Sequence, residues 1–343
     1  MDKEQLAQLL QDEQHWLATE AQLPSGAITT GSSRIVPYFS NIGAFGLVTT
    51  VPQVNPEGIE ATRRWLDWFV AHLNRPDRFG LNGTIYDYTA AVDGSVTSND
   101  DYDSADSYPA TFATLVLRYV KATGDTTWVK AHSDELDLLG QAMVASQDPA
   151  DGLTWAKPNY KVKYLMDNCE VYRGFVDLAA LMADVIGDAQ KASYYRQRAE
   201  VVKAGIEKKL WAGDGRGYYY YAMDQRGVRL GTNWGTWYPD QMAQLWPVLW
   251  GVLDPQSQRA KELWARFNKV APGWPTLERD DSFASAFVGL VALKMGERER
   301  ALTFVDAVKA RFFDRGNPWP WYSADAGWFM LLLESLVKGE ATF

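Results

Sequence analysis

Acidic side chains stand at the expected starts of several apolar helices, close to aromatic residues. Asp103 and Asp106 precede one such helix, and Asp167 and Glu170 open another, so that each pair is separated by three positions. This separation places both carboxyls on one side of a helix entrance. Two carboxyl groups, one neutral and one ionised, are able to act as general acid and general base on a single glycosidic bond.

Two further aspartates open the last two apolar segments in the same way. Each acidic residue has an alternative role, because Asp before a helix satisfies free backbone N–H groups as an N-cap. Glu170 lies three residues after Asp167 and could instead complete a capping box. Both roles stay open for the six candidate catalytic residues, which are Asp103, Asp106, Asp167, Glu170, Asp281 and Asp325.

Aromatic residues are unusually frequent, with 15 Trp, 17 Tyr and 14 Phe. Trp and Tyr bury large apolar faces and keep one polar group, so they suit both a large core and stacking against sugar rings. Trp65, Trp68, Trp246 and Trp250 have helical spacing, which predicts packing. Tryptophans in loops are harder to explain as core. We predict that substrate contacts come from some of Trp155, Trp234, Trp237, Trp274, Trp319 and Trp321.

Polar residues near the acidic positions are further binding candidates. Asp87 lies beside Tyr86 in a long loop, where it could bind a sugar hydroxyl or the attacking water, or simply stabilise a turn. Arg279 could bind substrate oxygens or an acidic sugar, with a structural ion pair as the alternative. The segment around Glu170 is crowded, which favours function there, and it adds the candidates Tyr164, Asn168, Tyr172 and Arg173.

The composition limits the classes of partner. The chain has 343 residues and a formal charge of −9, with no basic run, which argues against nucleic acid. A single cysteine, Cys169, excludes an internal disulfide and a cysteine-rich zinc site. The first residues lack the apolar core of a signal peptide, and no apolar run reaches membrane length. We expect a cytoplasmic protein, monomeric or weakly oligomeric, that needs no metal or cofactor and is not membrane-bound.

The pattern along the chain predicts twelve helices that pair into six hairpins. Apolar helices alternate with amphipathic ones, and Gly-Asp turns separate several pairs. A β-hairpin is expected between residues 212 and 235, where four consecutive tyrosines precede Asp224 and Gly227. The expected helices are 3–19, 37–51, 56–73, 109–122, 127–146, 169–186, 189–210, 238–252, 255–269, 282–295, 297–313 and 325–338.

This alternation favours a closed, two-layered helical ring over an open solenoid, because the units differ in length and lack a uniform period. We therefore predict an all-α (α/α)6 barrel with a small β-hairpin at the rim. No linker or change of composition divides the chain, so residues 1–343 are expected to form a single domain. In such a ring, the acidic starts of the apolar helices would converge on one cavity.

Several stretches resemble the six-hairpin glycosidase superfamily, which includes glucoamylases, trehalases, amylo-1,6-glucosidase-like enzymes and family 8 endoglucanases. The segment from Tyr102 to Phe112, with the turn at Gly124, is similar to the entry to the fourth helix of those enzymes. The segment from Asp167 to Gly174 resembles the next hairpin. The resemblance covers most of the chain as a pattern, although the Ser-Glu-Gly motif of family 8 is absent near the N-terminus.

The resemblance implies a glycoside hydrolase that acts on an oligosaccharide or polysaccharide with inversion at the anomeric carbon. It also implies that Glu170 occupies the position of the general acid in glucoamylase-like relatives and that Asp325 lies where relatives often have the base. A non-catalytic carbohydrate-binding protein and a polysaccharide lyase on the same fold remain alternatives. Sugar epimerases of the N-acylglucosamine type share this barrel and use paired histidines for proton transfer. An epimerase is disfavoured here because His15, His72 and His132 are all predicted in first or outer helices, away from the starts of the inner ones. The acidic run Asp100-Asp101-Tyr102-Asp103 also suggests a terpene cyclase. That class is disfavoured because no second metal-binding motif of the Asn-Ser-Glu type follows in the sequence.

Overall fold

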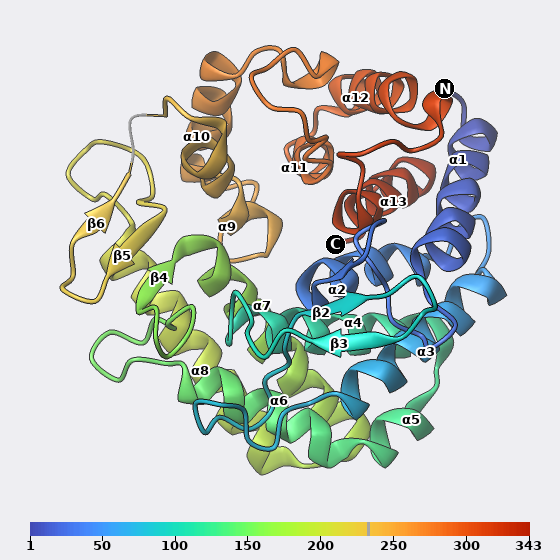
Figure 1. Cartoon of the computed structure of the whole chain (residues 1–343). Helices are drawn as coiled ribbons and strands as arrows, with labels where there is room; N and C mark the ends of the chain where they lie inside the picture. The colour runs from blue at the N-terminus through green and yellow to red at the C-terminus, as the bar shows by residue number, and fades with distance from the viewer. Residues whose placement is uncertain (232–233) are drawn as a thin grey trace.

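In the computed structural model, which describes residues 1–231 and 234–343, helices surround a common centre in two layers (Figure 1). Consecutive inner helices pack against one another, and the last one closes the ring by packing against the first. The architecture is therefore the all-α barrel of paired helices that the sequence predicts. The inner helices are α2 (Pro37–Leu47), α4 (Ser107–Thr123), α7 (Leu165–Ala180), α9 (Trp246–Leu249), α11 (Phe287–Lys294) and α13 (Ser323–Lys338).

The outer layer consists of amphipathic helices, each of which turns one apolar face towards the inner ring. The third and fourth outer helices correspond to one predicted helix, residues 127–146, that is broken at His132. Single π-helical turns prolong three helices at Leu17–Ala21, Leu181–Ile186 and Ile206–Leu210. The outer helices are α1 (Lys3–Trp16), α3 (Pro56–Ala71), α5 (Thr126–Ala131), α6 (Ser133–Ala145), α8 (Ala189–Gly205), α10 (Gln258–Val270) and α12 (Arg298–Arg311).

The turns between paired helices follow the predicted chemistry. Gly124 adopts a left-handed conformation at the end of α4, and Asp125 then caps α5 by accepting backbone N–H groups of Thr127 and Trp128. Gly187 and Asp188 repeat this arrangement between α7 and α8. A left-handed glycine followed by an N-cap aspartate reverses the chain within a few residues, so these two turns are confirmed.

Two three-stranded antiparallel sheets lie among the connections. The predicted hairpin exists, but a third strand from the segment before α7 joins it, and a second sheet forms near the start of the chain. Neither addition was predicted, because strands of two or three residues carry almost no periodic signal. The strands are β1 (Arg34–Ile35), β2 (Tyr88–Ala90) and β3 (Val96–Ser98) in one sheet, and β4 (Val162–Tyr164), β5 (Ala222–Asp224) and β6 (Arg229–Leu230) in the other.

Glycine allows the first and last inner helices to approach closely. A side chain at Gly327 of α13 would lie 1.9 Å from the carbonyl oxygen of Ile42 in α2. At the next turn, a side chain at Gly46 would meet Met330 at 2.5 Å. These contacts explain why the ring closes without a bulky residue at either position.

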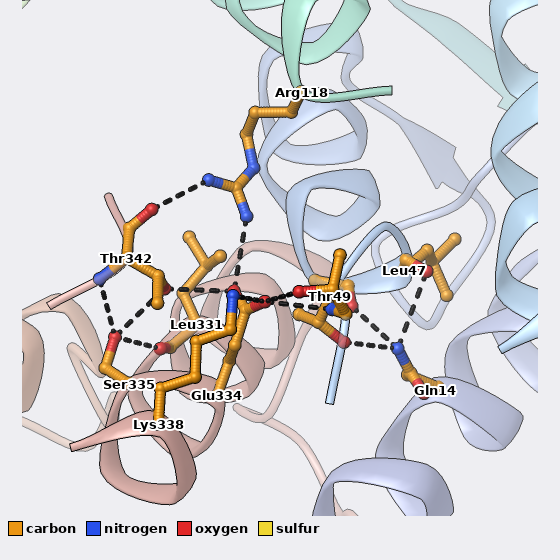
Figure 2. Close-up of polar contacts among 11 residues, drawn as sticks. Gln14, Leu47, Thr49, Arg118, Leu331, Glu334, Ser335, Lys338 and Thr342 are labelled. Carbon is orange, nitrogen blue, oxygen red and sulfur yellow. Dashed lines mark hydrogen bonds and ion pairs between the residues drawn. The ribbon is translucent and has the colours of Figure 1, made fainter. Parts of the chain in front are cut away.

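One end of the ring, which we call the floor, is held by a buried carboxylate near the end of α13 (Figure 2). Glu334 accepts hydrogen bonds from the backbone N–H of Thr50, from Lys338 and from the Thr342 hydroxyl, and Arg118 lies 3.5 Å away. These cationic partners hold the pKa of Glu334 below its usual range, although burial opposes them. The floor is thus closed by a charged and hydrogen-bonded network.

Phe343 fills the centre of the ring above this network, consistent with the position of the C-terminus in Figure 1. Its ring packs against Phe45, Trp250 and Trp328 at centroid distances of 5.0–5.6 Å. Arg118 also lies over this ring.

In the described part of the chain, no helix combines the length and apolar character that crossing a bilayer requires.

Candidate active site

The opposite end of the ring, where the inner helices begin, is called the rim here, and Asp106 is buried in it. Asp106 caps α4, and its Oδ1 accepts hydrogen bonds from the backbone N–H of Ser107 at 2.8 Å and from the Ser104 hydroxyl at 2.5 Å. Its Oδ2 is buried and has no hydrogen-bond partner among the described residues. Burial raises the pKa of Asp106 to about 6. Asp106 therefore serves as a cap and also presents an unpaired oxygen.

Glu170 lies one turn into α7 and shows the same division between its two oxygens. Its Oε1 accepts hydrogen bonds from the Tyr38 hydroxyl at 2.5 Å and from Trp246 Nε1 at 2.9 Å. Its Oε2 is buried and unpaired within the described chain. Burial raises the pKa of Glu170 to about 8, and the nearby charge of Asp106 adds to the effect.

Asp167 and Asp103 complete a group of four carboxyls at the starts of α4 and α7. Asp167 is half-buried in the first turn of α7, and burial raises its pKa well above the usual range. The charges of Asp106, Glu170 and Asp103 raise that pKa further. Because burial and nearby like charges disfavour ionisation, Asp106, Asp167 and Glu170 hold protons at a pH where isolated carboxyls would be ionised.

A second acidic position, Asp325, occupies the first turn of α13. Its Oδ1 accepts the backbone N–H of Ala286 at 2.8 Å, and its Oδ2 is buried without a partner in the described part of the chain. Ser285 has a φ of 53°, an uncommon value for a residue with a side chain. Burial raises the pKa of Asp325 to about 6, while the backbone N–H groups at residues 284–286 and the charge of Arg279 lower it.

Arg279 is the cation closest to this second position. Its guanidinium stacks on the Trp237 ring at 4.2 Å, and its Nη2 donates to the carbonyl oxygens of Phe283 and Ala284. Nε and Nη1 are buried and have no hydrogen-bond partner among the described residues. Burial lowers the pKa of Arg279 to about 10, although the charges of Asp281 and Asp325 oppose it.

Three tyrosines connect the two acidic positions. Burial and the charge of Glu170 raise the pKa of Tyr38 well above its usual range, and Tyr322 adds to this. Burial and the charge of Asp325 act likewise on Tyr322. Burial, and then the charges of Asp167, Asp103 and Glu170, raise the pKa of Tyr238. These mutual effects place the starts of α2, α7 and α13 close to one another at the rim, and we call this part of the rim the pit.

Aromatic rings form a continuous arc along one side of the pit. Successive ring centroids lie 5.1–6.2 Å apart, which is the ordinary range for aromatic pairs. Trp319 ends the arc and is 67% exposed. The arc runs through Tyr108, Tyr38, Phe39, Tyr322, Phe283 and Trp319. At its other end, the Tyr108 hydroxyl donates to Asp87 at 3.0 Å, and burial raises the pKa of Asp87 to about 6.

Several predicted binding residues lie elsewhere, and the structure corrects those predictions. Trp274 is fully buried behind α12 and donates to Asn268, and Trp321 is buried against α1 and donates to Glu13. Asn168 has all its polar atoms engaged by Thr154 and the Tyr164 carbonyl. These three side chains have no free surface or polar group for a ligand.

Two residues of α7 point away from the rim. Arg173 forms an ion pair with Asp177 at 2.8 Å and lies over Phe343 in the middle of the barrel. Tyr172 is half-buried beneath the ammonium group of Lys203 from α8. Their predicted role in binding came from the crowding of the segment around Glu170, and the helix was predicted to begin at residue 169. It begins four residues earlier, which turns these side chains away from the pit.

Three other predicted residues are at the rim or close to it. Tyr164 is half-buried near Asp167, and Asp281 accepts the backbone N–H of Phe283 in a turn beside Arg279. Tyr86 packs on Tyr102 in the long loop.

Two tryptophans from the predicted set contact basic residues outside the group of carboxyls. Trp234 is buried beneath Arg266. Trp155 lines a surface cavity of about 470 Å³ with Lys163, on the opposite face of β4 from Tyr164. Lys163 is paired there with Asp148 and Asp151, at 2.7 and 2.6 Å.

Sequence reasoning missed Tyr38, Tyr238, Trp246 and Tyr322 as residues of the site. Tyr38 and Tyr322 lie at the starts of α2 and α13, and Tyr238 lies in the π-helical turn Trp237–Gln241 before α9, so the rule that identified the aspartates could have included them. Trp246 could not be recognised, because its helical spacing is the ordinary signature of core packing.

Within residues 1–231 and 234–343, no group of three or more His, Cys, Asp or Glu is arranged to hold a metal ion.

No protein-family model and no curated protein matches the sequence. Among solved structures, the chain is similar to a glycosidase solved as the wild type, with a TM-score of 0.69 and 13% identity over 99% of both chains. That glycosidase was also solved with a tyrosine changed to phenylalanine, a phenylalanine changed to tyrosine, and each of two glutamates changed to alanine, one of these in complex with glucose.

Two other solved structures share the architecture. A β-1,3-1,4-glucanase from Paenibacillus sp. X4 has a TM-score of 0.67 and 12% identity, over 97% of this chain and 93% of its own. A rhamnosidase from Klebsiella oxytoca with rhamnose bound has a TM-score of 0.58 and 15% identity, over 96% of this chain and 64% of its own. At these identities the similarity defines the fold, which is one that glycosidases of different specificity use.

Proposed function

We propose that this protein is a glycoside hydrolase in which Glu170 is the general acid and Asp325 is the general base. The proposal rests on one observation, which is that the two oxygens of each carboxyl differ in their hydrogen bonding. One oxygen is fixed by donors from the protein, and the other is buried and has no hydrogen-bond partner among the described residues. Buried polar atoms without partners are rare in folded proteins and gather where a ligand supplies the missing bond.

The environments of the two carboxyls favour this assignment of roles. With a pKa of about 8, Glu170 is protonated at neutral pH, as a general acid must be. With a pKa of about 6, and with backbone N–H groups and Arg279 favouring its anion, Asp325 is largely ionised. Pairs of carboxyls whose surroundings separate their pKa values are a recurrent feature of acid–base catalysis.

The comparison with the solved glycosidase supports the same residues. Its altered positions follow the order tyrosine, glutamate, phenylalanine and glutamate along the chain. This chain has Tyr38, Glu170, Phe283 and Asp325 in that order, with separations that agree to within a few residues. Three of the four residue types are identical and the fourth is also acidic.

An inverting mechanism follows from these roles. Asp325 removes a proton from a water molecule, and the oxygen of that water bonds to the anomeric carbon. The bond from this carbon to the leaving oxygen breaks, and the leaving oxygen takes the proton from Oε2 of Glu170. The unpaired oxygen of Asp106 is suited to accept a sugar hydroxyl, and the aromatic arc is suited to contact the faces of the sugar rings.

The test measures the release of reducing ends from a panel of α- and β-linked oligosaccharides. Glu170→Gln and Asp325→Asn should each lower kcat by at least about 100-fold. Glu13→Gln is the matched control, because Glu13 is also a buried glutamate that accepts a tryptophan N–H, but it lies in the outer layer. Sugar binding without release would support a carbohydrate-binding protein instead. Retention of the anomeric configuration in the product would contradict the mechanism.

A further inference from the structure

Trp246 is held in one orientation against Glu170. It is the first residue of α9, is 5% exposed, and directs its indole N–H to Oε1 of Glu170 at 2.9 Å. The ring packs edge to face against Phe287, the first residue of α11, with centroids 4.6 Å apart. A single side chain thus links the start of α11 to the acid on α7.

The two donors to Glu170 reach the same oxygen. Tyr38 and Trp246 both donate to Oε1, and Oε2 receives no hydrogen bond from the described residues. A proton on Oε1 would face the indole N–H, which is able to donate but not to accept. The Tyr38 hydroxyl is able to rotate and accept, so it does not exclude that arrangement by itself.

We propose that Trp246 is a positioning residue that makes Oε2 the proton-bearing oxygen of Glu170 and sets how readily that proton is released. The hydrogen bond favours the ionised carboxylate, so its loss makes Glu170 a weaker acid. The consequence for catalysis rests on the proposed hydrolase function. The effect on the titration of Glu170 does not, which allows the two to be tested separately.

The first experiment uses the folded wild-type chain labelled with ¹⁵N at the tryptophan indoles. The Trp246 N–H resonance should move with pH and follow the ionisation of Glu170. Trp321 should also titrate, because its indole donates to Glu13, whose pKa burial raises to about 8. Glu170→Gln should abolish the pH dependence of Trp246 and leave that of Trp321 unchanged. A Trp246 resonance that still titrates in Glu170→Gln would overturn the proposal.

The second experiment compares Trp246→Phe with Trp250→Phe. Trp250 is fully buried, lies in the same segment and has no hydrogen bond from its Nε1 to any described residue, so its replacement controls for lost packing. Glutamate labelled with ¹³C at the side-chain carboxyl reports the titration, with the Glu170 signal assigned from Glu170→Gln. Trp246→Phe should raise the pKa of Glu170 by roughly one unit, whereas Trp250→Phe should leave it unchanged.

Activity provides the final comparison. Trp246→Phe should move the alkaline limb of the kcat/KM profile to higher pH, by the same roughly one unit as the pKa of Glu170. It should also lower kcat about tenfold, with KM little changed. An unchanged Glu170 titration, or an equal shift in Trp250→Phe, would overturn the role of Trp246. If the wild-type chain releases no sugar but the titrations behave as expected, the hydrolase function fails and the positioning contact stands.

Discussion

Replacing Glu13 by glutamine should make the protein more stable at neutral pH. Glu13 is fully buried in α1, where its carboxyl accepts hydrogen bonds from Trp321 Nε1 at 2.8 Å and Asn317 Nδ2 at 3.3 Å. No lysine, arginine or histidine within the described residues forms an ion pair with it. Burial therefore raises the pKa of Glu13 to about 8, and the two hydrogen bonds only partly oppose this.

The size of the effect follows from proton linkage. In the unfolded chain Glu13 titrates near 4.5, so between pH 4.5 and 8 the folded protein keeps a proton that the unfolded chain releases. The free energy of unfolding then falls by about 1.4 kcal/mol per pH unit as the pH rises through this window. At pH 7 the accumulated loss is about 3 kcal/mol, and at pH 5 it is less than about 1 kcal/mol.

Glutamine avoids this loss because it is neutral at every pH. Its carbonyl keeps the hydrogen bond from Trp321, and its amide is able to donate to Oδ1 of Asn317, which is buried and unpaired among the described residues. Urea unfolding at pH 5 and pH 7 measures the difference, with the slope against urea concentration as a check on the unfolded state. A gain that is equal at both values of pH, or a loss at pH 7, would refute the reasoning.

Four further outcomes are expected. The kcat/KM profile should be bell-shaped, with an acid limb near pH 6 from Asp325 and an alkaline limb near pH 8 from Glu170; limbs that survive Asp325→Asn or Glu170→Gln would contradict the assignment. Arg279→Met should move the acid limb upward, because the cation lowers the pKa of Asp325, and an unmoved limb would show that the charge is screened. Gly327→Ala should destabilise the fold by about 3 kcal/mol in urea unfolding, since its side chain would meet the Ile42 carbonyl. Trp319→Ala should raise KM several-fold with kcat unchanged if the exposed ring binds sugar, and steady-state kinetics on a longer oligosaccharide measures this.

The fold was predictable where the signals are local. The alternation of apolar and amphipathic segments marks the two layers, and the Gly-Asp turns at Gly124 and Gly187 fix where paired helices reverse. The starts of the inner helices were predictable to within a few residues for α4 and α13, which is why Asp106 and Asp325 were placed correctly at the rim.

The errors arise where distant contacts override local pattern. Helix α11 was predicted from residue 282 but begins at Phe287, because Asp325 from α13 takes the backbone N–H of Ala286 that a local cap would otherwise satisfy. The predicted helix over 238–252 is reduced to α9 and a preceding π-helical turn, with Pro247 at the start of α9 and not at a kink inside a longer helix. The spacing of Trp246 predicts a core residue, and its hydrogen bond to Glu170 on α7 is visible only in the structure.

The network around Glu334, drawn in Figure 2, fixes the floor, so the two ends of the barrel differ in their freedom to change. One carboxylate joins α13, the segment after α2 and, through Arg118, α4, so ring closure depends on a few residues far from the pit. Substitutions in the rim loops can therefore alter ligand preference while the floor keeps the ring intact. Hydrogen exchange should be slowest around Thr50 and Ser335, and a library for new specificity belongs in the loops that carry Asp87 and Trp319.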